Sequence, residues 1–206
     1  MTVGRYDYFL NEEPVDVYET FRIAREDGPV TLISSERVAK AYYNHLRVDA
    51  HYKAEACYQA DITYASSNGE GIRTANLQVC FQGSIAEAVR VADDVSIPQK
   101  IKLPDEYLFL PLLRVFTGNV IMKLLEKPLP VLIPNIKYPG DAENWFTLEF
   151  EERWSERDGD AFRFLGGQYD ESARFWLNND GLLTRYTWKQ KDEMRWDVRL
   201  TELDNE

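Results

Sequence analysis

The most informative stretch of this chain is Leu46–Tyr64, which reads LRVDAHYKAEACYQADITY. Every even-numbered residue in it is apolar or aromatic, and nearly every odd-numbered residue is polar. A period of two is typical of a β-strand that buries one face and exposes the other to water. An ordinary strand has about 5–6 residues, whereas this one, at ~3.3 Å per residue, would be about 60 Å long if straight. We therefore expect it to bend within a long antiparallel sheet that curls around something apolar.

Alternating segments recur on both sides of this stretch. The connections between them are too short for the crossovers that parallel strands need, so the sheet should be antiparallel. The tetrapeptide Asn178-Asn179-Asp180-Gly181 is a strong hairpin signal, and Gly166-Gly167 indicates a bulge or a close backbone approach. The expected strands span residues 15–23, 30–38, 46–64, 72–82, 146–154, 162–169, 173–177, 182–188 and 194–200.

The middle of the chain has a different pattern. Ser84 and Glu87 have the spacing of a capping box and predict a short helix. Residues 112–126 are apolar around most of a helical circumference, so this helix should be buried on more than one side. Three prolines within 128–134 predict an extended edge or crossing segment. With no repeat or linker, we expect residues 1–206 to form a single, mainly β domain, a half-barrel wrapped around one helix.

Composition excludes some classes of partner. The net charge of -11 and a pI near 4.8 disfavour binding to nucleic acid or to an acidic membrane surface. Polar residues interrupt the longest apolar stretch, which argues against stable membrane insertion. Residues 1–14 lack the apolar region of a signal peptide, so a cytoplasmic location is the default expectation. The two cysteines, Cys57 and Cys80, are expected to be free thiols.

No motif predicts a catalytic, metal or cofactor site. His45 and His51 lie near Asp49, which could orient a general base, but we interpret them as part of a solvated sheet face. Glu149 and Glu151 alternate with apolar residues and should point outward rather than form the acid pair of a glycoside hydrolase. Glu152 should point inward, where it would need a partner such as Arg174 or Arg185, or a ligand head group.

The aromatic residues form the one constellation with functional content. They should converge on the inner face of the curled sheet, where small residues such as Ala54 and Ala56 leave room beside them. An ordinary filled core would explain this pattern, and so would an apolar cavity between sheet and helix. The predicted ligand-binding residues are Tyr52, Tyr58, Phe150, Glu152, Trp154, Tyr186, Trp188 and Trp196.

The segment Phe175–Tyr186, FWLNNDGLLTRY, resembles the strand–Asp-Gly–strand near the end of bacterial glycolipid-binding proteins. The order of long strands, apolar helix, proline-rich stretch and further strands is similar to the half-barrel that this family shares with the periplasmic lipoprotein carriers. The resemblance implies a concave sheet that clasps a helix, with an amphiphile bound between them. Because the carriers are exported, the lack of a signal peptide favours the glycolipid-binding branch.

Three functions remain open from the sequence. The leading hypothesis is non-enzymatic binding of a lipid-like or other apolar small molecule between the sheet and the helix. The alternatives are an enzyme that acts on a hydrophobic substrate in the same cavity, and a structural or interaction module with a filled core. A roomy cavity favours the first, an inward Glu or His with a shifted pKa the second, and a solid core with an exposed apolar patch the third.

Overall fold

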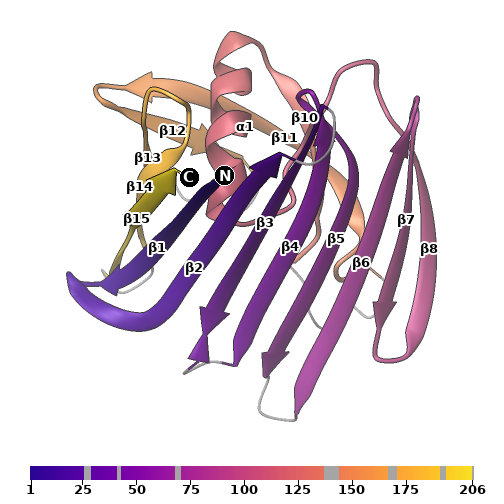
Figure 1. The fold of residues 1–206 in the computed structure, drawn as a ribbon, viewed down its shortest axis with the longest axis horizontal. Coiled ribbons are helices and arrows are strands. Elements are labelled where there is room, and N and C mark those ends of the chain that lie inside the picture. Colours follow the sequence, from indigo (N-terminus) through magenta and orange to yellow (C-terminus); the bar gives the residue numbers. More distant parts are fainter. Residues whose placement is uncertain are drawn as a thin grey trace.

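The computed structural model describes residues 1–25, 29–40, 43–67, 71–136, 144–166, 171–190 and 194–205. Over these residues the chain forms one curled sheet of fifteen strands and one helix, α1 (Arg114–Glu126), that lies against its concave side (Figure 1). The predicted architecture, a mainly β fold with a long antiparallel sheet wrapped around one mid-chain helix, is confirmed. In the described part of the chain, the helix is not long and apolar enough to cross a membrane.

The first eight strands form an antiparallel meander that runs outward from β1 to β8. The later strands extend the sheet on the other side of β1, with β15 beside β1 and β9 at the far edge. β1 pairs with β15, so the two ends of the chain lie side by side in the sheet. Across the sheet the order is β8-β7-β6-β5-β4-β3-β2-β1-β15-β14-β13-β12-β11-β10-β9. The bounds are β1 (Thr2–Leu10), β2 (Glu13–Arg25), β3 (Val30–Ala39), β4 (Asn44–Lys53), β5 (Ala56–Ser67), β6 (Ile72–Gln82), β7 (Ile85–Ala92), β8 (Val95–Lys102), β9 (Leu108–Phe109), β10 (Leu129–Pro134), β11 (Leu148–Asp158), β12 (Ala161–Leu165), β13 (Arg174–Leu177), β14 (Leu183–Lys189) and β15 (Arg195–Asn205).

The prediction of one continuous strand over 46–64 is wrong. The segment folds into a hairpin, β4 and β5, that turns at Ala54 and Glu55. Opposed residues are Leu46 with Tyr64 and, further along, Val48 with Ile62, so the even-numbered residues of β4 share one face with those of β5 from Ala60 onward. The two-residue turn shifts the phase of the alternation, since Lys53 pairs with Ala56 and Tyr52 with Cys57, and the register shift next to Tyr52 restores it further along β5. Ala54 takes a φ of 55°, the left-handed conformation that such a tight turn demands.

Two other expectations about the first half of the chain also fail. Residues 85–92 form strand β7 rather than a helix, because they pair along their whole length with both β6 and β8. Their alternating burial, with Ala86 and Ala88 inside and Val89 exposed, is that of a half-buried strand. The N-terminal residues form strand β1, which was not anticipated, and bury Tyr6 and Tyr8 in the core.

The predicted helix over 112–126 is confirmed, with its first turn at Arg114. Leu112 and Leu113 precede it with φ values of 67° and 54°, so the chain makes a sharp turn into the helix. The proline-rich stretch becomes β10, next to last in the sheet, which pairs fully with β11 and over two residues with β9. The predicted hairpin at Asn178–Gly181 joins β13 to β14: Asn178 Oδ1 accepts hydrogen bonds from the backbone N–H groups of Asp180 and Leu182.

Several predicted connections lie outside the described residues. Positions 26–28, 68–70 and 138–143 belong to connections between predicted elements, and positions 167–169 belong to the end of the predicted strand over 162–169. Gly166 is described, and a Cβ there would lie 2.4 Å from the carbonyl oxygen of Glu152. This confirms the close backbone approach expected at that glycine.

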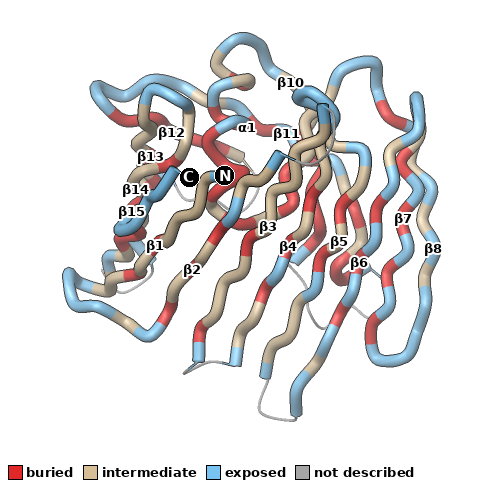
Figure 2. Tube along the Cα trace, in the orientation of Figure 1, coloured by how far each residue is buried: buried red, intermediate tan, exposed pale blue. Residues whose placement is uncertain are grey.

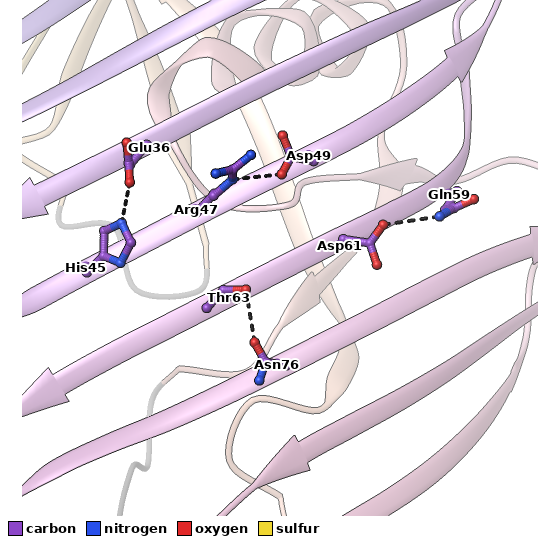
Figure 3. A network of polar contacts seen from close by, with 8 residues as sticks. All are labelled: Glu36, His45, Arg47, Asp49, Gln59, Asp61, Thr63 and Asn76. Carbon is purple, nitrogen blue, oxygen red and sulfur yellow. Dashed lines mark hydrogen bonds and ion pairs between the residues drawn. The ribbon is translucent and has the colours of Figure 1, made fainter.

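The two faces of the large sheet have opposite character. The concave face buries a continuous apolar core, seen as buried segments along β3–β7 in Figure 2. The convex face carries a row of polar pairs from β3 to β6 (Figure 3). Among them, His45 Nε2 lies 2.6 Å from Glu36 Oε1, and Arg47 Nε donates to Asp49 Oδ2 at 2.8 Å. The histidines therefore lie on the outer, solvated side of the sheet.

Side-chain hydrogen bonds link edge strand β8 and its neighbour β7 to the start of β11, near the opposite edge of the curled sheet. Gln99 of edge strand β8 donates to the backbone oxygen of Leu148 at 2.7 Å and accepts from its N–H at 2.9 Å. Buried Arg90 of β7 donates to the carbonyl oxygen of Trp145 at 2.8 Å. These bonds hold β7 and β8 against the start of β11 and give the open sheet its barrel-like closure.

Candidate functional site

Helix α1 stands inside the curled sheet, and a cavity opens on each side of it. The hairpin cavity, of about 480 Å³, lies between the β4–β5 hairpin, β9 and one side of the helix. The arginine cavity, of about 330 Å³, lies between the start of the helix, β3, β10, β11 and β14. Both volumes fall in the range of about 300–1,000 Å³ that is usual for small-molecule sites.

The interior of the hairpin cavity is uncharged. Its walls are apolar side chains of the sheet and helix, including Ile33, Phe109 and Phe116. Burial raises the pKa of the Tyr52 hydroxyl, and burial also raises the pKa of the Cys57 thiol to about 12. Both groups are therefore protonated and neutral at physiological pH. Such a lining suits an apolar ligand better than a charged one.

Charge appears only at the rim of the hairpin cavity. Lys123 of α1 and Glu55 of the β4–β5 turn form an ion pair of 2.8 Å, and both side chains line the cavity. The Glu55 side chain is well exposed, and the Lys123 side chain is partly exposed. A ligand with a polar end and an apolar chain would find matching surroundings at the rim and inside.

The arginine cavity combines an aromatic wall with charged groups. Tyr186 and Trp188 of β14 stack on each other at 4.7 Å and line one side. The Arg114 guanidinium lies 4.4 Å from the Tyr186 ring centre, a cation–π contact. Buried Arg153 donates through Nε to Glu151 Oε2 at 2.8 Å, also within this cavity.

The buried carboxylate of Glu19 holds the helix in place. Its Oε1 accepts hydrogen bonds from the backbone N–H groups of Arg114 at 2.7 Å and Val115 at 3.4 Å, and from Ser35 Oγ at 3.2 Å. The helix has no side-chain cap of its own, so this carboxylate from β2 satisfies its first N–H groups. Burial raises the pKa of Glu19 despite the attraction of Arg114. The carboxylate therefore serves as a tertiary helix cap.

Sequence reasoning missed Glu19, although a signal was present. In the strand over 15–23, Val17 and Phe21 have the apolar alternation of one buried face, and Glu19 lies between them at the same parity. A carboxylate at an inward position needs a partner, and here that partner is the start of a helix almost a hundred residues away in the chain. No local pattern identifies such a partner.

Four of the eight predicted ligand-binding residues lie on the inner side of the sheet. Tyr52 lines the hairpin cavity, while Tyr186 and Trp188 line the arginine cavity. Trp196 of β15 stacks on Trp188 with ring centres 5.4 Å apart, and its indole N–H donates to Gln190. The structure thus divides the predicted set between two cavities instead of gathering it in one.

The predicted inward position of Tyr58 is wrong. The β4–β5 pairing shifts between His51 and Tyr52, so that Gln59 opposes His51 and Cys57 opposes Tyr52. Tyr58 is the extra residue of this bulge and is 38% exposed, with its ring near His51 on the outer face. The same bulge turns Cys57 inward.

The predicted phase of the strand over 146–154 is wrong from Phe150 onward, although Phe146 and Leu148 are buried as expected. Glu151 and Arg153 point inward as a buried ion pair, whereas Phe150, Glu152 and Trp154 are exposed. Period two indicates which residues share a face but not which face is inside. The charged face is tolerated inside because Glu151 and Arg153 bind each other.

The expected partners of Glu152 are engaged elsewhere. Arg174 pairs with Asp158 at 2.7 Å, and Arg185 pairs with Asp197 at 2.8 Å. Glu152 is exposed and needs no buried partner. Among the described residues, three or more His, Cys, Asp or Glu side chains nowhere gather in a group that could hold a metal ion.

Comparison with known proteins identifies the fold but not the family. The structure is similar to the crystal structure of a β-barrel-like protein of domain of unknown function DUF1849 from Brucella abortus, with a TM-score of 0.56. The match covers 100% of this chain and 97% of that one, at 9% sequence identity, so it shows a shared barrel-like fold alone. No family model matches the chain, and no curated protein matches it in sequence.

Proposed function

We propose that this protein binds a lipid-like or other apolar small molecule in the hairpin cavity and does not transform it. The observation that supports this most is the cavity itself, about 480 Å³ of apolar-walled space between a concave sheet and a helix. A filled-core module would gain from closing such a hollow, because its apolar walls would then be removed from water. An apolar chain would occupy the interior, and its polar end would lie at the rim beside Lys123 and Glu55.

The enzyme alternative has less support in this cavity. The ionisable side chains that line it below the rim are Tyr52, Cys57 and Tyr107, and burial raises the pKa of each, so all three stay protonated at neutral pH. A catalytic base or nucleophile works best with a pKa near the working pH. Binding without chemistry is therefore the function that the geometry favours.

A chain-length series tests the proposal. Delipidated protein is titrated with saturated fatty acids of increasing length, which displace a dye-labelled fatty acid. Each added methylene should strengthen binding about fourfold, from ~0.8 kcal/mol per buried CH₂. The gain should stop once the cavity is full.

A matched pair of variants assigns the binding to this cavity. Thr31 of β3 opposes Tyr52 and lines the cavity, so Thr31→Leu should shorten the preferred chain. Ala24 of β2 lies on the opposite face of the sheet from Phe21 and Ile23, so Ala24→Leu should leave the preference unchanged. Lack of binding at every length, or the same profile for both variants, would overturn the proposal.

A further inference from the structure

We propose that the arginine cavity is a second binding site, for a small amphiphilic anion. Its ligand would carry one carboxylate on a short aliphatic or aromatic body. The site is separate from the hairpin cavity, and the inference does not depend on lipid binding there.

The first argument is the local charge. Arg37 of β3, Arg114 of α1 and Arg153 of β11 all line this cavity, and Glu151 is the one carboxylate among its lining residues. Three cations still face only two carboxylates when Glu19, beneath the start of the helix, is included. The chain as a whole has a net charge of -11, so this excess of positive charge is local and opposite to the general trend.

The second argument is that the guanidinium groups are held in position. Arg37 Nη2 donates to Asn44 Oδ1 at 3.0 Å, and Asn44 Nδ2 donates to the Tyr64 hydroxyl at 2.9 Å. The Tyr186 ring orients Arg114, and Glu151 orients Arg153. A planar guanidinium with five donors matches the geometry of a carboxylate. Groups fixed before binding lose little further entropy when a ligand arrives.

The third argument concerns the rest of the ligand. The remaining wall is apolar and aromatic, with Leu46, Leu110, Ile133 and Trp188 around the arginines. A volume of about 330 Å³ is at the lower end of the range for small-molecule sites, so a short body fits and a long acyl chain does not. Few polar anchors in an apolar wall are typical of a small-molecule site.

Calorimetric titration with 4-phenylbutyrate and with 4-phenylbutan-1-ol tests this inference, because the two probes differ only in the charged head. Wild-type protein should bind the acid at least about tenfold more tightly than the alcohol, as expected for hydrogen bonds to a charged group. Added salt should reduce the difference. Equal affinity for the two probes, or no binding of the acid, would overturn the inference even if no variant folds.

Two variants that each remove one positive charge then locate the site. Arg37→Gln should weaken binding of the acid about tenfold, whereas Arg47→Gln, on the outer face beside Asp49, should not change it. Ile136 lines the cavity and is 39% exposed, so Ile136→Trp should fill the space and abolish binding of both probes. Equal behaviour of the two arginine variants would refute the assignment. Thr31→Leu, in the hairpin cavity, should leave binding of the acid unaffected, which separates the two sites.

Discussion

Replacing Gly118 by alanine sets helix propensity against packing. Propensity alone predicts that Ala stabilises a helix interior by about 1 kcal/mol relative to Gly. A Cβ at this position would, however, lie 2.0 Å from the carbonyl oxygen of Gly181, in the turn between β13 and β14. Ordinary contact needs about 3.5 Å, so helix or turn would have to move by about 1.5 Å.

We expect the steric cost to win. The contacted atom belongs to the backbone of a turn that Asn178 fixes through two hydrogen bonds, so it cannot rotate away as a side chain would. Overpacking of this kind costs about 1–3 kcal/mol, and sometimes more. After the propensity gain is subtracted, Gly118→Ala should lower the free energy of unfolding by up to about 2 kcal/mol.

Urea unfolding followed by far-ultraviolet circular dichroism measures this change. Asn119 is the next residue of α1 and is exposed, so Asn119→Ala reports propensity without the clash and should stabilise by about 0.5 kcal/mol. If Gly118→Ala were instead more stable than the wild type by the full propensity gain of about 1 kcal/mol, the helix would not lie against the turn as the structure has it.

Three further predictions concern stability and reactivity. Leu124 is 4% exposed on α1, so Leu124→Ala should cost about 2–5 kcal/mol in thermal or chemical unfolding, and a loss below about 0.5 kcal/mol would place it at the surface. Burial raises the pKa of Glu19 above its ordinary 4.5, so the folded chain holds this proton more tightly than the unfolded chain. The free energy of unfolding of the wild type should therefore fall relative to that of Glu19→Gln as the pH rises from below 4.5 through the raised pKa. If the difference in unfolding free energy between the two proteins did not change with pH, burial would not control this carboxyl group. Exposed Cys80 should react with a thiol reagent in the folded protein, while Cys57, with a pKa of about 12, should react only after unfolding.

The sequence predicted the features that depend on local pattern. Alternation over 46–64 indicated which residues share a face, and this held for Leu46, Val48 and Ile62 although the segment is a hairpin. The apolar circumference of residues 112–126 predicted a buried helix, and the Asn-Asn-Asp-Gly turn at 178–181 predicted a hairpin. In each case the side chains themselves carry the signal, through their spacing or their backbone preference.

Some predictions were wrong because the same local pattern is compatible with more than one structure. Ala-rich residues 85–92 fit a helix or a strand, and only pairing with β6 and β8 selects the strand. The turn at Ala54 and Glu55 shifts the parity of the alternation and the bulge at Tyr58 shifts it back, so a hairpin and a long strand look alike over most of the segment. Helix propensity and periodicity are properties of a segment, whereas strand pairing is a property of two segments.

Only the tertiary structure decided which side chains line the inside of the barrel-like sheet. The bulge at Tyr58 and the phase of β11 determine that Cys57, Glu151 and Arg153 face the cavities, while Trp154 does not. The sequence determined that an apolar helix would lie within a curled antiparallel sheet, because burial of apolar surface requires it. Which polar groups accompany that helix depended on distant contacts such as that between Glu19 and Arg114, since a buried charge is tolerated only where folding supplies its partner.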